Sequence, residues 1–229
     1  RFWNYISFQF YVSTSSKGSN KRNKMEHNIM ADVKFYTCFP TIVFESKFVA
    51  KDEITNCIKT NQMRKDNRSF VRQSVDNNLQ KVDAFKPFVK KVYKVTEEMC
   101  QLYEYEYKKI EITGMWINIS EPNQAHPPHT HSNNVFSGVW YPCDNTDASN
   151  IQFFDPRPQS GVLVPKRKKM DTNNSSIIWF ASNKDSMFMF PSWLTHWVPP
   201  TPVTRTSISF NVMLRGDYGE PNTLQNAHI

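Results

Sequence analysis

Apolar and polar residues follow two different periods along the chain, and the period changes near residue 108. Over residues 51–107, apolar side chains recur at steps of three and four, as in an amphipathic helix. The clearest segment is AFKPFVKKVYKVTEEMCQLYEYEY at 84–107. Its apolar stripe consists of Phe85, Phe88, Val92, Val95, Met99 and Leu102. We therefore expect helical support over 51–107, with this helix packed against a sheet.

Between residues 108 and 215 the pattern changes to short segments rich in β-branched and aromatic residues. Clusters of Pro, Asn, Asp and Ser separate these segments, which is typical of strands. The candidate strands are KKIEITGMWINIS, VFSGVWYP, NIQFF, SSIIWFA, SMFMFP, THWVP and RTSISFNVML. A series of short strands predicts a sandwich or barrel. We therefore expect a mainly β fold with flanking helices and a β core at 108–215.

One long connection interrupts the predicted strands. Residues 155–174, DPRPQSGVLVPKRKKMDTNN, are polar, basic and contain three prolines. A connection of this length inside a compact β domain is usually functional or disordered. It is a candidate lid or substrate-recognition loop, and a solvated basic loop is the alternative interpretation.

Composition indicates one globular domain. The chain has 229 residues, of which 39% are hydrophobic, and it contains no run of 18 apolar residues that could span a membrane. Its four cysteines, Cys38, Cys57, Cys100 and Cys143, form no C-x-x-C pair. We expect reduced thiols and a cytoplasmic location.

The net charge of +7 is concentrated near the start of the chain. Residues 1–24 carry five basic residues and no acid, so the other 205 residues hold 23 basic and 21 acidic side chains, a charge of +2. This nearly neutral part argues against a dedicated nucleic-acid groove. We interpret residues 1–24 as a partial or mis-started leader, disordered and outside the fold, and residues 25–229 as a single domain.

Histidines cluster in the stretch HPPHTHSNN at 126–134. His129 and His131 are two residues apart, and a strand would direct both side chains to the same face. His196 lies on a later predicted strand, and a jelly roll can bring distant strands together around a metal. His126 is three residues from His129, so a strand would direct it away, and we place it in a loop beside the site. Each histidine taken alone could be a satisfied polar residue; the joint pattern favours a metal site.

The stretch VTRTSISFN at 203–211 suggests a second polar site. In a strand, Arg205, Ser207 and Ser209 share one face. A guanidinium that points into a β core is costly unless it meets an anion. Arg205 together with the Ser207 hydroxyl would suit a carboxylate. An ion pair within the chain explains Arg205 equally well at this point.

Four ordered stretches resemble the 2-oxoglutarate- and Fe(II)-dependent oxygenases, in particular those of marine phage and bacterial genomes. They are HTHSNNVFSGVWYP, IQFFDPR, FPSWLTHWVPP and RTSISFN, within roughly residues 112–213. The resemblance implies a double-stranded β-helix, or jelly roll. It also implies Fe(II) bound by His129 and His196, and 2-oxoglutarate bound through its distal carboxylate by Arg205 and Ser207. The implied reaction is hydroxylation of an unactivated C–H bond in a peptide residue or small molecule, with release of succinate and carbon dioxide.

The chain departs from the usual motif of this family at one position. The motif is His-x-Asp followed by a distal His, and His131 stands where the Asp is expected. The site could therefore have three histidines, two histidines and a water, or Asp155 as a recruited acid. The PHTH stretch is similar to that of aspartyl/asparaginyl β-hydroxylases, which bind iron without this carboxylate. We favour His131 because its spacing from His129 directs it to the metal, and because neutral imidazole suits Fe(II).

Two other functions are compatible with the predicted fold. A cupin-type metalloenzyme would use the H-x-H pair without 2-oxoglutarate, but such sites usually add a glutamate four or five residues later, and none stands there. A non-enzymatic jelly-roll binding module would leave Arg205 and Ser207 unexplained. Succinate production from 2-oxoglutarate, with and without Fe(II), distinguishes both from the oxygenase.

We expect five aromatic residues to line the cavity or pack in the core: Trp116, Trp140, Phe153, Trp179 and Trp193.

Overall fold

The computed structural model describes residues 36–66 and 71–229. Thr41–Ile229 form one compact unit, and everything below concerns this unit. The leader predicted at 1–24 lies outside the described residues. In chain order, the elements are β1 (Phe44–Lys47), α1 (Asp52–Thr60), β2 (Met63–Lys65), β3 (Arg72–Ser74), the 3-10 turns η1 (Leu79–Lys81) and η2 (Asp83–Phe85), α2 (Lys86–Tyr103), β4 (Lys109–Ser120), β5 (His126–His129), β6 (Phe136–Trp140), β7 (Ile151–Phe154), η3 (Pro158–Gly161), β8 (Ile177–Phe180), β9 (Ser186–Pro191), β10 (His196–Val198), β11 (Arg205–Arg215), β12 (Asp217–Tyr218) and β13 (Ala227–His228).

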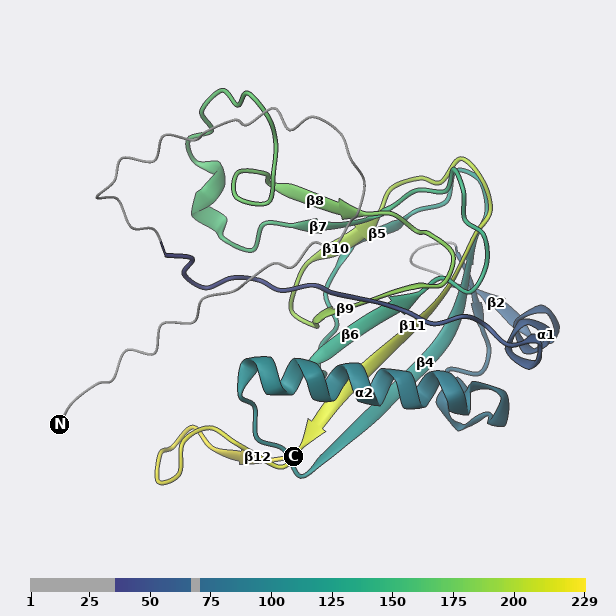
Figure 1. Ribbon diagram of the computed structural model, residues 1–229, viewed down its shortest axis with the longest axis horizontal. Helices are drawn as coiled ribbons and strands as arrows, with labels where there is room; N and C mark the ends of the chain where they lie inside the picture. The colour runs from purple at the N-terminus through teal and green to yellow at the C-terminus, as the bar shows by residue number, and fades with distance from the viewer. Residues whose placement is uncertain (1–35, 67–70) are drawn as a thin grey trace, which may run out of the picture. The chain divides into compact units, whose positions relative to one another are not determined.

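The strands form two main antiparallel sheets (Figure 1). The larger has seven strands in the order β1-β9-β6-β11-β4-β3-β2, and the smaller has four in the order β5-β10-β7-β8. From β4 to β11 the chain crosses repeatedly between the two sheets, which is the winding of a double-stranded β-helix. The predicted jelly roll is confirmed, and all seven predicted segments contain strands.

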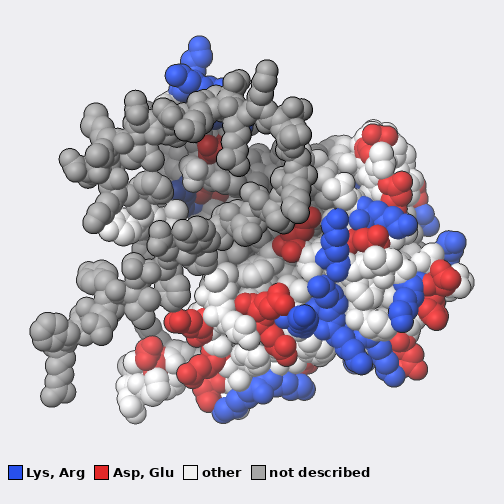
Figure 2. Space-filling view, in the orientation of Figure 1, with Lys and Arg blue, Asp and Glu red and all other residues white. Residues whose placement is uncertain are grey.

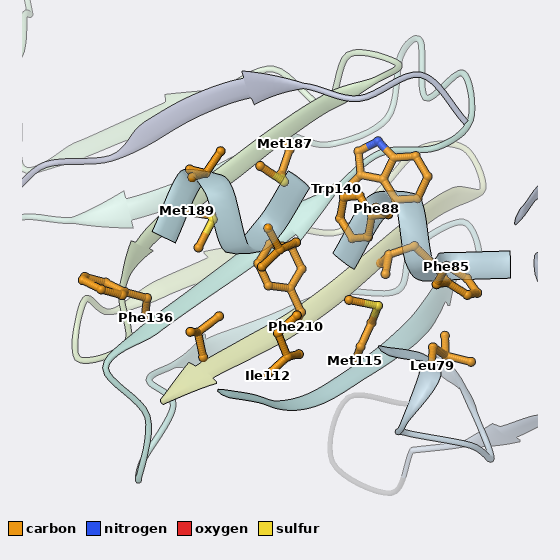
Figure 3. Packing of buried hydrophobic residues seen from close by; sticks show 14 of the residues in the cluster. Leu79, Phe85, Phe88, Ile112, Met115, Phe136, Trp140, Met187, Met189 and Phe210 are labelled. Atoms are coloured by element: carbon orange, nitrogen blue, oxygen red, sulfur yellow. The ribbon is translucent and has the colours of Figure 1, made fainter. Parts of the chain in front are cut away.

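Helix α2 covers one face of the seven-stranded sheet (Figure 3). The ring of Phe88 stacks on that of Trp140 at 4.3 Å between centroids and meets Phe210 edge-on at 5.7 Å. The predicted apolar stripe is buried as expected, except for Leu102 in the last turn, which is 39% exposed. Phe85 is buried too, but it belongs to η2, immediately before the helix.

The prediction of helices throughout 51–107 is wrong for the part between α1 and α2. There β2 and β3 form a hairpin that extends the large sheet beyond β4, with Arg72 opposite Ile119 and Gln73 opposite Asn118. These strands have only three residues each and are largely exposed, so they carry no apolar alternation for the sequence to reveal. Pairing with β4, including the 2.5 Å ion pair between Arg72 and Glu121, fixes their conformation.

Alternate side chains of strand β11 face opposite sides of the large sheet. Ile208 and Phe210 belong to the apolar cluster under α2. Arg205 and Ser207 point to the opposite face, into a pocket between the sheets. The predicted alternation is thus confirmed. Because both faces of the sheet are covered, continuous apolar segments such as β9 are buried along their whole length.

Two surface features bear on interactions. On the described part of the face shown in Figure 2, which carries α2, Lys and Arg side chains are intermixed with Asp and Glu. No helix among residues 36–66 and 71–229 has the length and apolar character needed to cross a membrane. Within this unit, Cys57, Cys100 and Cys143 are free thiols.

The stack of Phe88 on Trp140 yields a test of the core. Phe88→Ala removes a fully buried ring and leaves a cavity, so we expect the free energy of unfolding to fall by ~3–5 kcal/mol. Glu98→Ala, at an exposed position of the same helix, is the matched control and should change it by less than about 0.5 kcal/mol. Urea denaturation measures both; equal stability of the two variants would contradict the packing described here.

Candidate metal and carboxylate site

Three imidazoles converge at one end of the roll. His129 ends β5 and His196 begins β10, and the two are directly opposite in the antiparallel ladder. His131 lies two residues beyond the end of β5, and its backbone N–H donates to Ser192 O at 2.9 Å. His131 lies beside the other two histidines, as the sequence predicted, but it is not in a strand as that prediction assumed. A loop tied to the β9–β10 turn positions this residue.

The distances within this cluster suit one metal ion. One ring nitrogen from each histidine lies within 4.8 Å of the other two. The Nε2 atoms of His131 and His196 are 3.3 Å apart. Two nitrogens bonded to one ion at ~2.0–2.1 Å, at a right or tetrahedral angle, are separated by about this distance. Among the described residues, no other group of three or more His, Cys, Asp or Glu side chains has such a spacing.

Backbone carbonyls fix the orientation of two of these rings. His129 Nδ1 is 2.7 Å from Pro127 O, and His196 Nδ1 is 2.9 Å from Leu194 O. A carbonyl oxygen can only accept, so each Nδ1 carries the proton and each Nε2 lone pair remains available. His131 has no such carbonyl partner among the described residues, so its proton can move between the two ring nitrogens as a metal enters.

The environment keeps two of these histidines neutral. Burial disfavours the charged imidazolium and, with repulsion from His129, lowers the pKa of His131 to about 4. Burial likewise lowers the pKa of His196 to about 3, despite the opposing hydrogen bond to Leu194 O. Neutral imidazole is the form that binds a metal, so no proton has to be displaced from these side chains at neutral pH.

Asp155 has a different partner. Its two carboxylate oxygens accept from Arg157 Nε at 3.0 Å and Arg157 Nη2 at 2.8 Å. This pairing holds the pKa of Asp155 well below its usual range. Asp155 does not belong to the cluster of possible metal ligands. Its geometry therefore favours a surface ion pair over metal binding.

Arg205 is a buried cation without a carboxylate partner among the described residues. It is 2% exposed. Its Nη2 donates to Tyr141 Oη at 2.8 Å, its Nη1 to Ser207 Oγ at 3.3 Å, and its Nε lies 3.5 Å from Ser182 Oγ. The intrachain ion pair that the sequence left open is thus not present in the described part of the chain. The hydroxyl groups and the Tyr141 ring, whose centroid is 4.9 Å from Arg205 Cζ, position the guanidinium, but no carboxylate among the described residues offsets its charge.

Sequence reasoning missed Tyr141 and Ser182. Alternation along β6 could have directed Tyr141 inward, since Ser137 and Val139 share its face, but nothing in the pattern names Arg205 as its partner. Ser182 follows β8 in an irregular segment, where no periodicity applies. Both contacts exist only because strands distant in sequence meet across the roll.

His126 also differs from the prediction. It begins β5 instead of lying in a loop, and it faces the pocket. Burial, with repulsion from Arg205 and His129, lowers its pKa to about 3, against an opposing effect of Asp66. His126 is therefore a neutral imidazole in the same pocket as Arg205 and the histidine triad of His129, His131 and His196.

One pocket connects the imidazole cluster with the guanidinium. Its walls include His129, His131, His196, Arg205, Ser207 and Trp116. Of the five aromatic residues predicted for the cavity or core, only Trp116 lines this pocket. Trp140 and Phe153 are core residues, and Trp179 and Trp193 are exposed. A ligand that bridges a metal and an arginine would occupy this space.

Comparison with known proteins agrees with this arrangement. Residues 114–211 match the family described as "Putative 2OG-Fe(II) oxygenase". No curated protein sequence matches the chain. The match covers most of the roll and contains every residue of the triad as well as Arg205 and Ser207.

Several solved structures share the fold at low sequence identity. A prolyl-4-hydroxylase from Pseudomonas putida is 12% identical, covers 76% of this chain and 94% of its own, and gives a TM-score of 0.54. The non-heme alpha ketoglutarate-dependent epimerase SnoN from nogalamycin biosynthesis is 9% identical over 80% of this chain and 81% of its own, with a TM-score of 0.55. An oxidoreductase of the 2OG-Fe(II) oxygenase family from Burkholderia pseudomallei is 12% identical over 70% and 75%, with a TM-score of 0.51.

The identities are too low for these neighbours to show more than the fold. The family match is a sequence match, and it includes the strands on which His129, His196, Arg205 and Ser207 lie. Over residues 114–211, the chain is therefore similar to the 2OG-Fe(II) oxygenase family, and its fold is that of the solved 2OG-dependent enzymes.

Proposed function

We propose that this protein is a hydroxylase in which His129, His131 and His196 bind Fe(II) and Arg205 with Ser207 binds the distal carboxylate of 2-oxoglutarate. The observation that carries the proposal is a single pocket that holds three converging imidazoles and an uncompensated buried guanidinium. The reaction converts a substrate C–H bond, O2 and 2-oxoglutarate into the hydroxylated product, succinate and carbon dioxide. One oxygen atom enters the product and the other enters succinate.

The donor set fits Fe(II). Imidazole is a suitable ligand for iron, and three protein ligands leave positions open for the cosubstrate and O2. Iron bound there supplies the oxygen chemistry, and the protein supplies orientation and a pocket of restricted access. Three imidazoles give the site no negative charge of its own. A metal bound here would therefore have one negative charge fewer around it than a metal in a site with Asp at this position.

Arg205 fits a dicarboxylate. Its burial is costly in the free protein because no carboxylate among the described residues offsets its charge. A bound carboxylate accepts from the planar guanidinium in a bidentate manner and from the Ser207 hydroxyl, and so offsets that cost. Tyr141 and Ser182 limit the movement of the guanidinium. The same contacts leave the arginine pre-positioned for its anion.

We place the substrate entrance at the turn between β9 and β10. Trp193, 56% exposed, stands there between Ser192 and Leu194, whose carbonyl oxygens accept from His131 N–H and His196 Nδ1–H. A peptide residue or a small molecule could pack on this indole while its C–H bond approaches the triad. The loop at 155–174 begins directly after β7, which pairs with β10, and remains the predicted recognition loop.

The first prediction concerns the metal ligands. His129→Ala, His131→Ala and His196→Ala should each lower iron affinity and abolish most turnover. His131→Asp should retain iron and activity, because a carboxylate at this position gives the commoner triad. Asp155→Ala should leave iron binding unchanged. Iron stoichiometry and succinate formation measure these outcomes; full activity in His129→Ala would refute the enzyme proposal.

The second prediction concerns the carboxylate. Arg205→Lys keeps the positive charge but loses the planar guanidinium that can donate two parallel hydrogen bonds to a carboxylate. Binding of 2-oxoglutarate should therefore weaken by about 1–3 kcal/mol. Arg205→Met should bind still less, and Ser207→Ala should have a milder effect. The unliganded Arg205→Met variant should not lose stability, since it removes an uncompensated buried charge.

Thermal unfolding with and without 2-oxoglutarate gives the readout. The ligand should raise the melting temperature of the metal-loaded wild type and fail to do so in Arg205→Met. Arg215→Met is the matched control, because Arg215 lies at the far end of the same strand and pairs with Glu111. Equal ligand-induced shifts in Arg205→Met and Arg215→Met would exclude Arg205 as the carboxylate anchor.

A further inference from the structure

A β-bulge at two prolines changes the direction of His126. In the β5–β10 ladder, His129 is opposite His196 and His126 is opposite Val198, so three steps along β5 correspond to two along β10. In a regular strand, residues three apart face opposite sides. The extra residue at Pro127–Pro128 cancels this alternation, and both histidines line the pocket.

The prolines are compatible with the bulge because β5 is an edge strand of its sheet. Proline has no N–H to donate to a ladder, so it is confined to edges and bulges. Pro127 also contributes its carbonyl oxygen, which accepts from His129 Nδ1. One irregularity therefore orients a triad ring and brings a fourth imidazole into the pocket.

Among the described residues, the imidazole of His126 has no hydrogen-bond partner that would explain its position in the pocket. Neither ring nitrogen hydrogen-bonds to a described residue. It does not belong to the group of side chains whose spacing suits a metal. It lines the same pocket as Arg205, Ser207 and the three converging histidines. This is the space that the dicarboxylate would fill.

We infer that His126 is a cosubstrate-positioning residue, which donates an N–H to the carboxylate of 2-oxoglutarate that Arg205 holds. The inference rests on the proposed function and extends it by a residue outside the triad and the arginine–serine pair. A neutral imidazole always carries one N–H, so it can serve as a donor without titrating. Its flat ring also narrows the pocket and would disfavour dicarboxylates of a different length.

The test compares two substitutions of His126. His126→Phe keeps the ring and its volume but removes the donor, and His126→Gln restores an N–H of similar reach. N-oxalylglycine is titrated calorimetrically into Mn(II)-loaded full-length protein. We expect its affinity to fall about tenfold or more in His126→Phe, as for the loss of one hydrogen bond to a charged group, and to recover to within about threefold of wild type in His126→Gln.

Turnover and metal content distinguish positioning from a structural role. In His126→Phe, the KM for 2-oxoglutarate should rise more than kcat falls, while Mn(II) stoichiometry and the urea midpoint stay as in wild type. His228→Phe makes the same change in the remote β12–β13 hairpin and should leave N-oxalylglycine affinity unchanged. A loss of bound Mn(II) in His126→Phe would overturn the inference, because His126 would then be a metal ligand.

The outcomes also separate this inference from the proposed function. If Arg205→Met abolishes binding of N-oxalylglycine and His126→Phe leaves it unchanged, His126 is not a positioning residue and the oxygenase proposal stands. If neither variant changes the affinity, both fail. Weakening in His126→Phe without recovery in His126→Gln would also overturn the donor role.

Discussion

The organisation of this protein depends on the burial of both faces of its seven-stranded sheet. Helix α2 covers one face, where Phe88, Trp140 and Phe210 form the central contact. The four-stranded sheet covers the other. Because side chains alternate along each strand, the helix-facing positions supply most of the apolar core. Some positions that face the smaller sheet carry polar groups instead: Arg205 and Ser207 line the pocket from the large sheet, and His129 and His196 line it from the smaller one.

Within the roll, one pocket combines three converging imidazoles with one buried guanidinium. Backbone carbonyls of Pro127 and Leu194 hold two rings so that their Nε2 atoms point inward. Burial keeps His131 and His196 uncharged. Arg205 is surrounded by hydroxyl groups instead of acids. Under the proposed function, a metal ion would bind at the imidazole end of the pocket, and a keto dicarboxylate would bridge that metal and the guanidinium.

Irregular backbone brings two of the four histidines to the pocket. The Pro127–Pro128 bulge turns His126 toward the pocket, and the loop after β5, tied to Ser192, brings His131 to the triad. The bulge and the loop both lie beside β10, the short strand that begins with His196. Of these two histidines, only His126 is one that a regular strand would direct away from the pocket. Together with His129 and His196, they place four of the chain's six histidines in one pocket.

The sequence by itself determined the elements whose side chains repeat with a regular period. It placed α2, all the strands of the roll from β4 to β11 except the HPPH strand β5, and the inward face of Arg205 and Ser207, because helix and strand periods are local properties of the chain. It also singled out the three histidines. It could not find the β2–β3 hairpin, the strand position of His126 or the partners of Arg205. Those depend on pairing with β4, on an inserted residue that reverses alternation, and on Tyr141 and Ser182 meeting the arginine across the roll. Contacts between distant strands set all three, so only the tertiary structure decided them.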